Sequence, residues 1–311
     1  MKVIYWLKIW FFVFFFLLIG AFVLIIYLNK FENVPLRFTN SISFDAKLNF
    51  LKKSEKWNNV EIIIIGSSMG LNNINSGILS YEFQNENIVN ISSWGLKVQE
   101  VFDLLKLINL SKVKKIIYLN QYFDFYGESI NDYNKEHVKK YLNNKFDLSP
   151  YLKTFNTLNY DFIDYILWKK RYINNNYYND LGFNEYGDVE LFIPKHNINL
   201  KRWNEIVNTE NLKNNFDSFE NMIKFLNKNK IELIVVTTPY RKEFFSIDKF
   251  INQYNAYSMK ILELNKQYDF KYINLQNSLE LSDTFFVDSS HLSSKGAELV
   301  SKKIVEIIKK D

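Results

Sequence analysis

Ile62-Ile63-Ile64-Ile65-Gly66-Ser67-Ser68-Met69 is the stretch that decides the fold of this chain. Consecutive β-branched residues favour a strand that is buried on both faces, as in a parallel sheet covered by helices. Gly66 ends this strand, so Ser67 and Ser68 lie at its carboxyl end, where open α/β sheets bind their ligands. A serine at such a place can act as a nucleophile only if a base reaches it.

Strand and helix patterns alternate along most of the remaining chain. The helical segments carry apolar residues at helical spacing, as Val98, Val101 and Leu105 do. We predict strands at residues 61–65, 88–91, 115–119, 231–237 and 271–275, and helices at 74–83, 97–109, 213–228, 251–264 and after His291. Five strands with interleaved helices predict a three-layer α/β/α sandwich around a parallel sheet.

The composition excludes several classes of protein. With 311 residues, 47% of them hydrophobic, the chain can bury a sizeable core. The 39 basic residues are scattered among 34 acidic ones without a basic stripe, so the net charge of +5 indicates a mixed surface and no nucleic-acid partner. The absence of cysteine excludes disulfides, thiolate metal sites and cysteine nucleophiles. Three dispersed histidines do not favour a metal centre, and the stretch at 66–70 is neither a dinucleotide nor a Walker motif, so no cofactor is expected.

The amino-terminal segment is expected to be a membrane anchor. From Ile9 to Leu28 the chain carries no charge, and a helix of this length covers about 30 Å, the thickness of the hydrocarbon core. Trp6 and Trp10 at one end and Tyr27 at the other fit the aromatic belts of the two interfaces. A cleaved signal peptide would have a shorter apolar region and a small-residue cleavage site, which this segment lacks. We therefore expect residues 1–30 to form an uncleaved transmembrane helix. The basic residues that flank it do not decide its orientation.

The rest of the chain divides into a connector and a folded domain. Residues 31–60 are polar and carry few structural signals, so we expect them to lift the domain off the membrane. Residues 61–311 form the domain, in which the alternation of strand and helix lapses at about residues 122–209. We expect an insertion there, beside the active edge of the sheet, with a helix at Tyr160–Tyr172. Its aromatic residues, such as Phe125, either stack on sugar rings or pack under the long loop.

A candidate base lies in Val287-Asp288-Ser289-Ser290-His291-Leu292, just before the last helix. A carboxylate three residues ahead of a histidine can accept the ring N–H, fix the tautomer and stabilise the imidazolium. This segment and Ser68 are expected at the same edge of the sheet. In the alternative interpretation, the serines and Asp288 only cap the helices that follow them. His137 and His196, which have no matching partner, are expected at the surface.

With these motifs, the chain resembles the SGNH, or GDSL-type, hydrolases that have one amino-terminal membrane anchor. The family has a flavodoxin-like sandwich and a Gly-Asp-Ser motif after its first strand, which corresponds to Gly66-Ser67-Ser68 and implies Ser68 as the nucleophile. The family's Asp-x-x-His block is matched by Asp288 and His291.

Two further blocks of the family contribute the oxyanion hole. The second block resembles residues 90–95 and implies Gly95, whereas the third, Gly-x-Asn-Asp, is matched only loosely by Tyr118-Leu119-Asn120-Gln121. Asn120 is the implied donor, with Gln121 as the alternative. The resemblance covers about residues 60–120 and 230–308, and it departs from the family where Ser67 replaces the usual aspartate.

The resemblance implies a serine mechanism without cofactor or metal. Ser68 would attack an acyl carbonyl while His291 removes its proton and Asp288 holds the imidazole. The backbone N–H groups of Ser68 and Gly95, with the side chain of Asn120, would stabilise the oxyanion, and one such donor commonly contributes about 3 kcal/mol.

The fate of the acyl-enzyme is open, because water would resolve it in an esterase and a sugar hydroxyl in a transferase. Anchored relatives resembling alginate O-acetylation and teichoic-acid D-alanylation proteins modify extracytoplasmic polymers beside a multispanning acyltransferase. By this resemblance we expect an anchored O-acyl, and specifically O-acetyl, transferase or esterase with its domain outside the cytoplasm. Its expected substrate is a cell-envelope polysaccharide or another acylated glycan, and its expected partner a multispanning acyltransferase. The alternative is a catalytically inactive scaffold or glycan-binding protein of the same fold.

Overall fold

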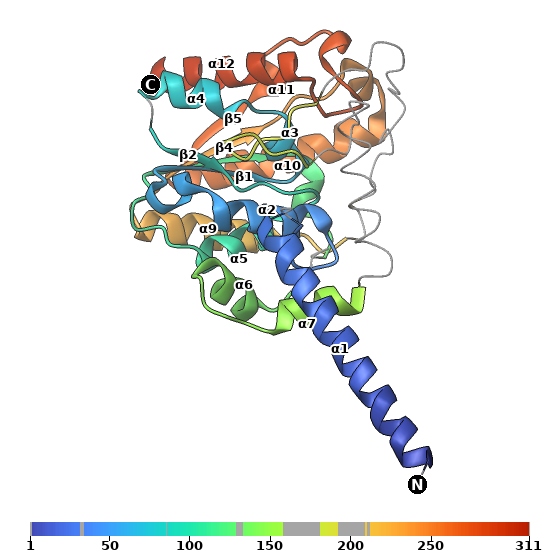
Figure 1. The fold of residues 1–311 in the computed structure, drawn as a ribbon. Coiled ribbons are helices and arrows are strands. Elements are labelled where there is room, and N and C mark those ends of the chain that lie inside the picture. The colour runs from blue at the N-terminus through green and yellow to red at the C-terminus, as the bar shows by residue number, and fades with distance from the viewer. Residues whose placement is uncertain are drawn as a thin grey trace.

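A five-stranded parallel sheet forms the centre of the computed structural model (Figure 1), which describes residues 2–31, 34–84, 86–128, 133–157, 181–191, 209 and 212–310. The strands are β1 (Ile62–Gly66), β2 (Ile88–Asn90), β3 (Lys115–Asn120), β4 (Glu232–Thr237) and β5 (Lys271–Asn274). Their order is β2-β1-β3-β4-β5, and all neighbouring pairs are parallel. This is the flavodoxin-like order, in which the chain reverses direction across the sheet at β1 and β3. The predicted fold class is confirmed.

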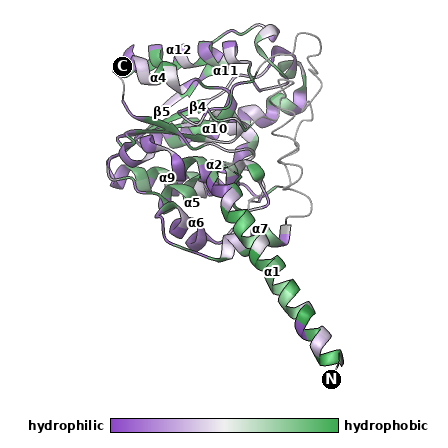
Figure 2. Ribbon diagram, viewed as in Figure 1, coloured by the Kyte–Doolittle hydropathy of each residue, from purple (hydrophilic) through white to green (hydrophobic). Residues whose placement is uncertain are grey.

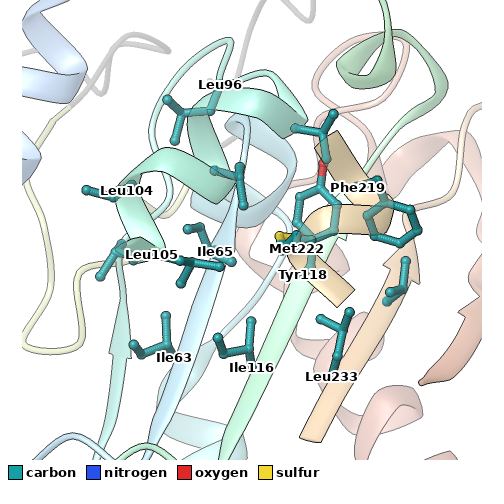
Figure 3. Packing of buried hydrophobic residues seen from close by; sticks show 14 of the residues in the cluster. Ile63, Ile65, Leu96, Leu104, Leu105, Ile116, Tyr118, Phe219, Met222 and Leu233 are labelled. Atoms are coloured by element: carbon teal, nitrogen blue, oxygen red, sulfur yellow. The ribbon is translucent and has the colours of Figure 1, made fainter. Parts of the chain in front are cut away.

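The run of isoleucines is buried on both faces, as its composition predicts. Ile63 and Ile65 belong to one apolar core, whereas Ile62 and Ile64 belong to the other. Figure 3 shows the first of these cores, where Ile63, Ile65 and Ile116 of the sheet pack beneath Leu104 and Leu105 of a helix. Since every residue of β1 is shielded by helices, no polar side chain is tolerated before Gly66.

Helices cover both faces of the sheet and give the three layers. The first core receives side chains from α2 (Ile42–Lys53), α5 (Val98–Leu107), α6 (Lys135–Leu142), α9 (Phe216–Lys228) and α10 (Asp248–Gln267). The second receives them from α3 (Ser68–Asn72), α4 (Ser76–Glu82), α11 (Leu275–Ser278) and α12 (Ser294–Lys310). The remaining described helices are α1 (Lys2–Phe31), α7 (Ser149–Thr157) and the 3₁₀ turns η1 (Glu55–Asn59), η2 (Tyr122–Phe125), η4 (Lys242–Ser246) and η5 (Asp283–Phe285).

Helix α1 extends away from the domain and is apolar along most of its length (Figures 1 and 2). It is long and apolar enough to cross a membrane, and most of its large apolar side chains are exposed. Among the described residues, the carboxyl-terminal part of α1 contacts the domain. There Ile25 is buried, and the Asn29 side chain donates hydrogen bonds to Val34 O at 2.8 Å and Asn49 Oδ1 at 3.2 Å.

Residues 31–60 are not the connector that the sequence predicts, because α2 is packed into the domain. Phe44, Leu48 and Leu51 are buried in the first core. Lys47 is also buried, and its Nζ donates to Asn90 O at 3.0 Å and Gly187 O at 2.5 Å. Lys47, one of the polar residues that suggested a linker, is thus hydrogen-bonded inside the fold.

The described parts of the predicted insertion are also joined to the domain. Val189 N donates to Leu71 O at 3.0 Å, and the buried Asp188 accepts from Ser76 N at 2.8 Å. His137, expected to have no partner, lies with Nδ1 2.5 Å from Asp147 Oδ2. The predicted helix at Tyr160–Tyr172 and His196 lie outside the described residues.

Candidate active site

The turn from β1 into α3 distinguishes the two serines. Ser67 is fully buried and caps α3, accepting a hydrogen bond from Met69 N at 3.4 Å. Ser68 is the first residue of α3 and is only partly buried. A Cβ on Gly66 would lie 2.0 Å from Leu119 O, so only glycine allows this close approach of β1 to β3. Of the two serines at this junction, Ser68 and not Ser67 is therefore partly accessible.

Asp288 and His291 form the predicted carboxylate–histidine pair. His291 Nδ1 lies 2.8 Å from Asp288 Oδ2, and the other carboxylate oxygen accepts from Ser290 N at 2.9 Å and His291 N at 2.8 Å. Asp288 is completely buried, whereas the His291 side chain is 14% exposed. Because the carboxylate holds Nδ1, the nitrogen that would act on a serine is Nε2.

Asn73 joins this histidine loop to the helix that begins with Ser68. Asn73 is fully buried at the end of α3, and its Nδ2 donates to Ser290 O at 2.7 Å. Leu292 N donates back to Asn73 Oδ1 at 2.8 Å, across 219 residues of sequence. On the other side of the loop, Arg241 N donates to Ser289 O at 3.1 Å. The structure thus brings the serine helix and the Asp-x-x-His loop together at one edge of the sheet.

The turn after β2 carries Gly95 to the same junction. Ser93 N donates to Gly66 O at 3.2 Å, which places residues 92–95 beside the end of β1. Asn90 fixes the turn, since its Oδ1 accepts from Ser92 N at 2.9 Å and its Nδ2 donates to Gly70 O at 2.7 Å. Gly95 itself has a φ of +66°, which glycine adopts without strain. The predicted oxyanion-hole glycine therefore lies in the turn next to the serine helix.

The structure gives no support to Asn120 as an oxyanion donor. Its side chain is fully buried, with Oδ1 accepting from the Tyr257 hydroxyl and Nδ2 donating to Tyr118 O at 3.4 Å. Strand alternation explains this, because Asn120 points to the same face of β3 as Tyr118, into the first core. Gln121, the alternative donor, is also buried, and its Oε1 accepts from the Tyr240 hydroxyl at 3.1 Å.

Asp124 is a residue of this junction that the sequence analysis missed. Its Oδ2 accepts from Ser67 Oγ at 2.8 Å and from Gln121 N at 3.1 Å. Burial raises the pKa of the Asp124 carboxyl to about 6, although the charge of Lys97 and the hydrogen bond from Ser67 act in the opposite direction. Ser67 stands where the resembling family has an aspartate, so in this chain the carboxylate at the junction comes from η2, the turn that follows β3. The available signal in the sequence was a carboxylate four residues after Asn120, but its aromatic neighbours indicated a segment that only packs against the core.

A parallel sheet in this order, with a serine after its first strand and an Asp-x-x-His pair before its last helix, agrees with the arrangement that the resemblance to the SGNH family implies. In agreement, residues 169–309 match the model of the family described as DltD protein, and the predicted resemblance to the SGNH superfamily is confirmed. The matched segment contains Asp288 and His291 but begins after Ser68. No curated protein matches the chain.

Solved structures of lipolytic proteins are similar to this chain at low identity. One from Desulfitobacterium hafniense, assigned to the G-D-S-L family, is 11% identical with a TM-score of 0.40, and the alignment covers 80% of this chain and 99% of the other. A lipase from a goat rumen metagenome is 10% identical at a TM-score of 0.42, with 79% and 95% covered. A Bacteroides fragilis protein described as an acylhydrolase is 11% identical at 0.39, with 81% and 88% covered. We assign no residue from them.

Proposed function

We propose that this chain is a membrane-anchored serine acyltransferase or esterase that acts through an acyl-Ser68 intermediate. The observation that carries the proposal is the pair of hydrogen bonds between Asn73 and the loop of Asp288 and His291. They hold a buried carboxylate–histidine pair on the short helix whose first residue is a partly exposed serine. Helix capping alone does not need a carboxylate bonded to both a ring nitrogen and two backbone N–H groups.

In the proposed mechanism, His291 removes the proton from Ser68 Oγ as the oxygen attacks the acyl carbonyl. Asp288 holds the ring tautomer and stabilises the imidazolium that forms. The backbone N–H groups of Ser68 and Gly95 receive the oxyanion, and collapse of the tetrahedral species expels the leaving alcohol with a proton from His291. The imidazole then activates the acceptor hydroxyl, which takes the acyl group and regenerates the serine.

The acceptor is proposed to be a hydroxyl of an extracytoplasmic cell-envelope polysaccharide, and the acyl group to be acetyl. An apolar α1 favours a reaction at a membrane. We propose that the domain lies outside the cytoplasm, because the proposed acceptor lies there. A multispanning acyltransferase is the proposed source of acyl groups, because a transferase of this kind needs a donor from across the membrane. The match to the DltD family model is consistent with an acyl-transfer or esterase reaction.

A fluorophosphonate probe tests the serine chemistry. We expect the full-length protein to be labelled, Ser68→Ala to lose labelling, and Ser67→Ala, the matched change at the adjacent serine, to retain it. Asp288→Asn should slow labelling because the carboxylate no longer stabilises the imidazolium. Labelling of Ser68→Ala, or none of the wild type, would support the inactive scaffold instead.

Transfer and hydrolysis are distinguished by the fate of an acetyl group from an activated ester. With an oligosaccharide acceptor present, a transferase yields an acetylated sugar in proportion to acceptor concentration, whereas an esterase yields only acetate. A reporter fused after Phe31 tests the orientation, because activity of a cytoplasmic reporter at that place contradicts the extracytoplasmic assignment.

A further inference from the structure

Residues 145–152, the turn before α7 and the first part of that helix, expose large apolar side chains on the domain surface. Phe146 is 78% exposed, Leu152 50% and Leu148 44%. Tyr151 stacks on Phe146 with ring centroids 6.2 Å apart. We call these four residues the α7 patch. A cluster of this kind on a soluble surface marks a contact with a partner or with lipid.

The α7 patch is continuous with the membrane helix. Tyr151 packs on its other side against Phe22 of α1, with ring centroids 5.6 Å apart. Figure 1 shows α7 beside α1 at the end of the domain from which α1 emerges. The apolar surface of α1 therefore passes without interruption onto the domain.

The length of α1 places this contact at the level of the bilayer. The uncharged run ends at Leu28, but Phe22 is already in contact with α7. From Ile9 to Ala21 the helix covers only about 20 Å, whereas the hydrocarbon core is about 30 Å thick. The part of α1 from Phe22 to Leu28 must then lie at least partly in the membrane, and α7 lies beside it.

Charge around the α7 patch also fits a lipid surface. Lys139, Lys140 and Lys145 are exposed on α6 and the turn that follows it. The nearby Asp147 is engaged by His137 at 2.5 Å and lies 3.9 Å from Lys140. Exposed lysines beside apolar side chains are the composition of elements that lie in the interface of membranes with anionic headgroups.

We propose that the α7 patch inserts into the headgroup and acyl boundary of the bilayer, so that the domain is held against the membrane at a second place beside α1. Lys139, Lys140 and Lys145 contact anionic headgroups around it. The proposal requires α1 to cross the membrane, but it is independent of the serine chemistry, and a protein without acyltransferase activity would still show it.

Because the chain has no cysteine, single cysteines can carry a spin label at chosen surface positions. Phe146→Cys and Leu152→Cys report on the patch, and Tyr81→Cys and Met259→Cys serve as controls at apolar side chains that are 76% and 70% exposed elsewhere. All four replace exposed side chains, so folding is retained. The full-length protein is reconstituted in phosphatidylcholine vesicles with about a third phosphatidylglycerol. Collisions are measured with oxygen, which concentrates in the bilayer, and with a water-soluble nickel chelate.

At residues 146 and 152 we expect the oxygen-to-nickel collision ratio to be several-fold higher than at residues 81 and 259. Removal of phosphatidylglycerol should lower the ratio at the patch only, and an unchanged ratio would overturn the role of the lysines. If the nickel chelate reaches residue 146 as readily as residue 259, the patch lies in water and the proposal is overturned. The membrane-spanning part of α1 would then lie nearer the amino terminus and include Lys8. Shielding from both reagents also overturns it, since it indicates contact with a second protein copy.

Discussion

Replacement of Asn73 by alanine should separate His291, the proposed catalytic base, from the serine helix. The change removes two hydrogen bonds, from Asn73 Nδ2 to Ser290 O at 2.7 Å and from Leu292 N to Asn73 Oδ1 at 2.8 Å. Ser290 and Leu292 are buried, so their backbone groups lose partners that water does not replace. Each such group costs about 1–3 kcal/mol, or about 2–6 kcal/mol for both.

If the loop relaxes away from α3 to relieve this cost, His291 is less often in place to take the proton of Ser68. A shift of about 1.4–2.8 kcal/mol in that equilibrium lowers the rate about tenfold to a hundredfold. The assay is the second-order rate of fluorophosphonate labelling of the full-length protein, with the free energy of unfolding measured in parallel in urea.

Asn72→Ala is the matched control, because Asn72 is a buried asparagine of the same helix whose Nδ2 donates to Val189 O at 2.9 Å and not to the histidine loop. We expect it to lower stability but to leave the labelling rate within about threefold of the wild type. Equal rates for Asn73→Ala and wild type, or equal losses in both variants, would refute the argument that Asn73 positions the histidine.

Three further changes test the buried polar groups. The pKa of Asp124 is about 6 in the native state against an ordinary 3.8, so the native state binds this proton more tightly than the unfolded chain. The free energy of unfolding therefore falls as pH rises from about 4 to 6. Asp124→Asn should remove about 3 kcal/mol of this fall, as measured by urea unfolding across that pH range. Burial lowers the pKa of Lys47, so above neutral pH the unfolded chain binds more protons than the native state. The free energy of unfolding therefore rises with pH up to the ordinary pKa of 10.5. The same rise in a Lys47→Met variant would contradict Lys47 as its cause. Asn120→Ala should lower stability by about 1–3 kcal/mol through the bond to Tyr257, with labelling of Ser68 little changed; a loss of about a hundredfold or more in rate would instead restore Asn120 to the oxyanion hole.

The sheet could be predicted because its strands are chemically uniform. Ile62 to Ile65 have no polar residue to place, so burial on both faces is the only arrangement that shields them. The same reasoning could not find α2, in which Asp45, Lys47 and Asn49 stand among the apolar residues. Lys47 and Asn49 have partners far along the chain, Gly187 and Tyr141, whereas Asp45 is bonded by the nearby Thr39. No local sequence pattern predicts the two distant pairings.

The oxyanion hole illustrates the same limit at the site itself. Position along β3 placed Asn120 at the correct edge of the sheet, but strand alternation turns its side chain into the first core, where the Tyr257 hydroxyl from α10 donates to it. Asp124 lies four residues further along the chain and accepts a hydrogen bond from Ser67, the residue before the proposed nucleophile Ser68. The family's blocks suggested Gly95 and Asn120 for the oxyanion hole but gave no indication of Asp124, whose carboxylate accepts a hydrogen bond from Ser67 and cannot donate one to an oxyanion.

The division of the site between distant parts of the chain determines how firmly each residue is assigned. The family match at residues 169–309 includes Asp288 and His291 but not Ser68, so sequence similarity alone leaves the histidine without a serine. Asn73 links the two parts of the site. Its two hydrogen bonds reach 217 and 219 residues along the chain and fix the loop of Asp288 and His291 on the helix that Ser68 begins. Any other residue at position 73 would leave a carbonyl or an N–H of the same loop without its hydrogen-bond partner, and this costs free energy. The assignment of Ser68 as nucleophile therefore depends more on Asn73 than on the Gly-Ser-Ser motif itself.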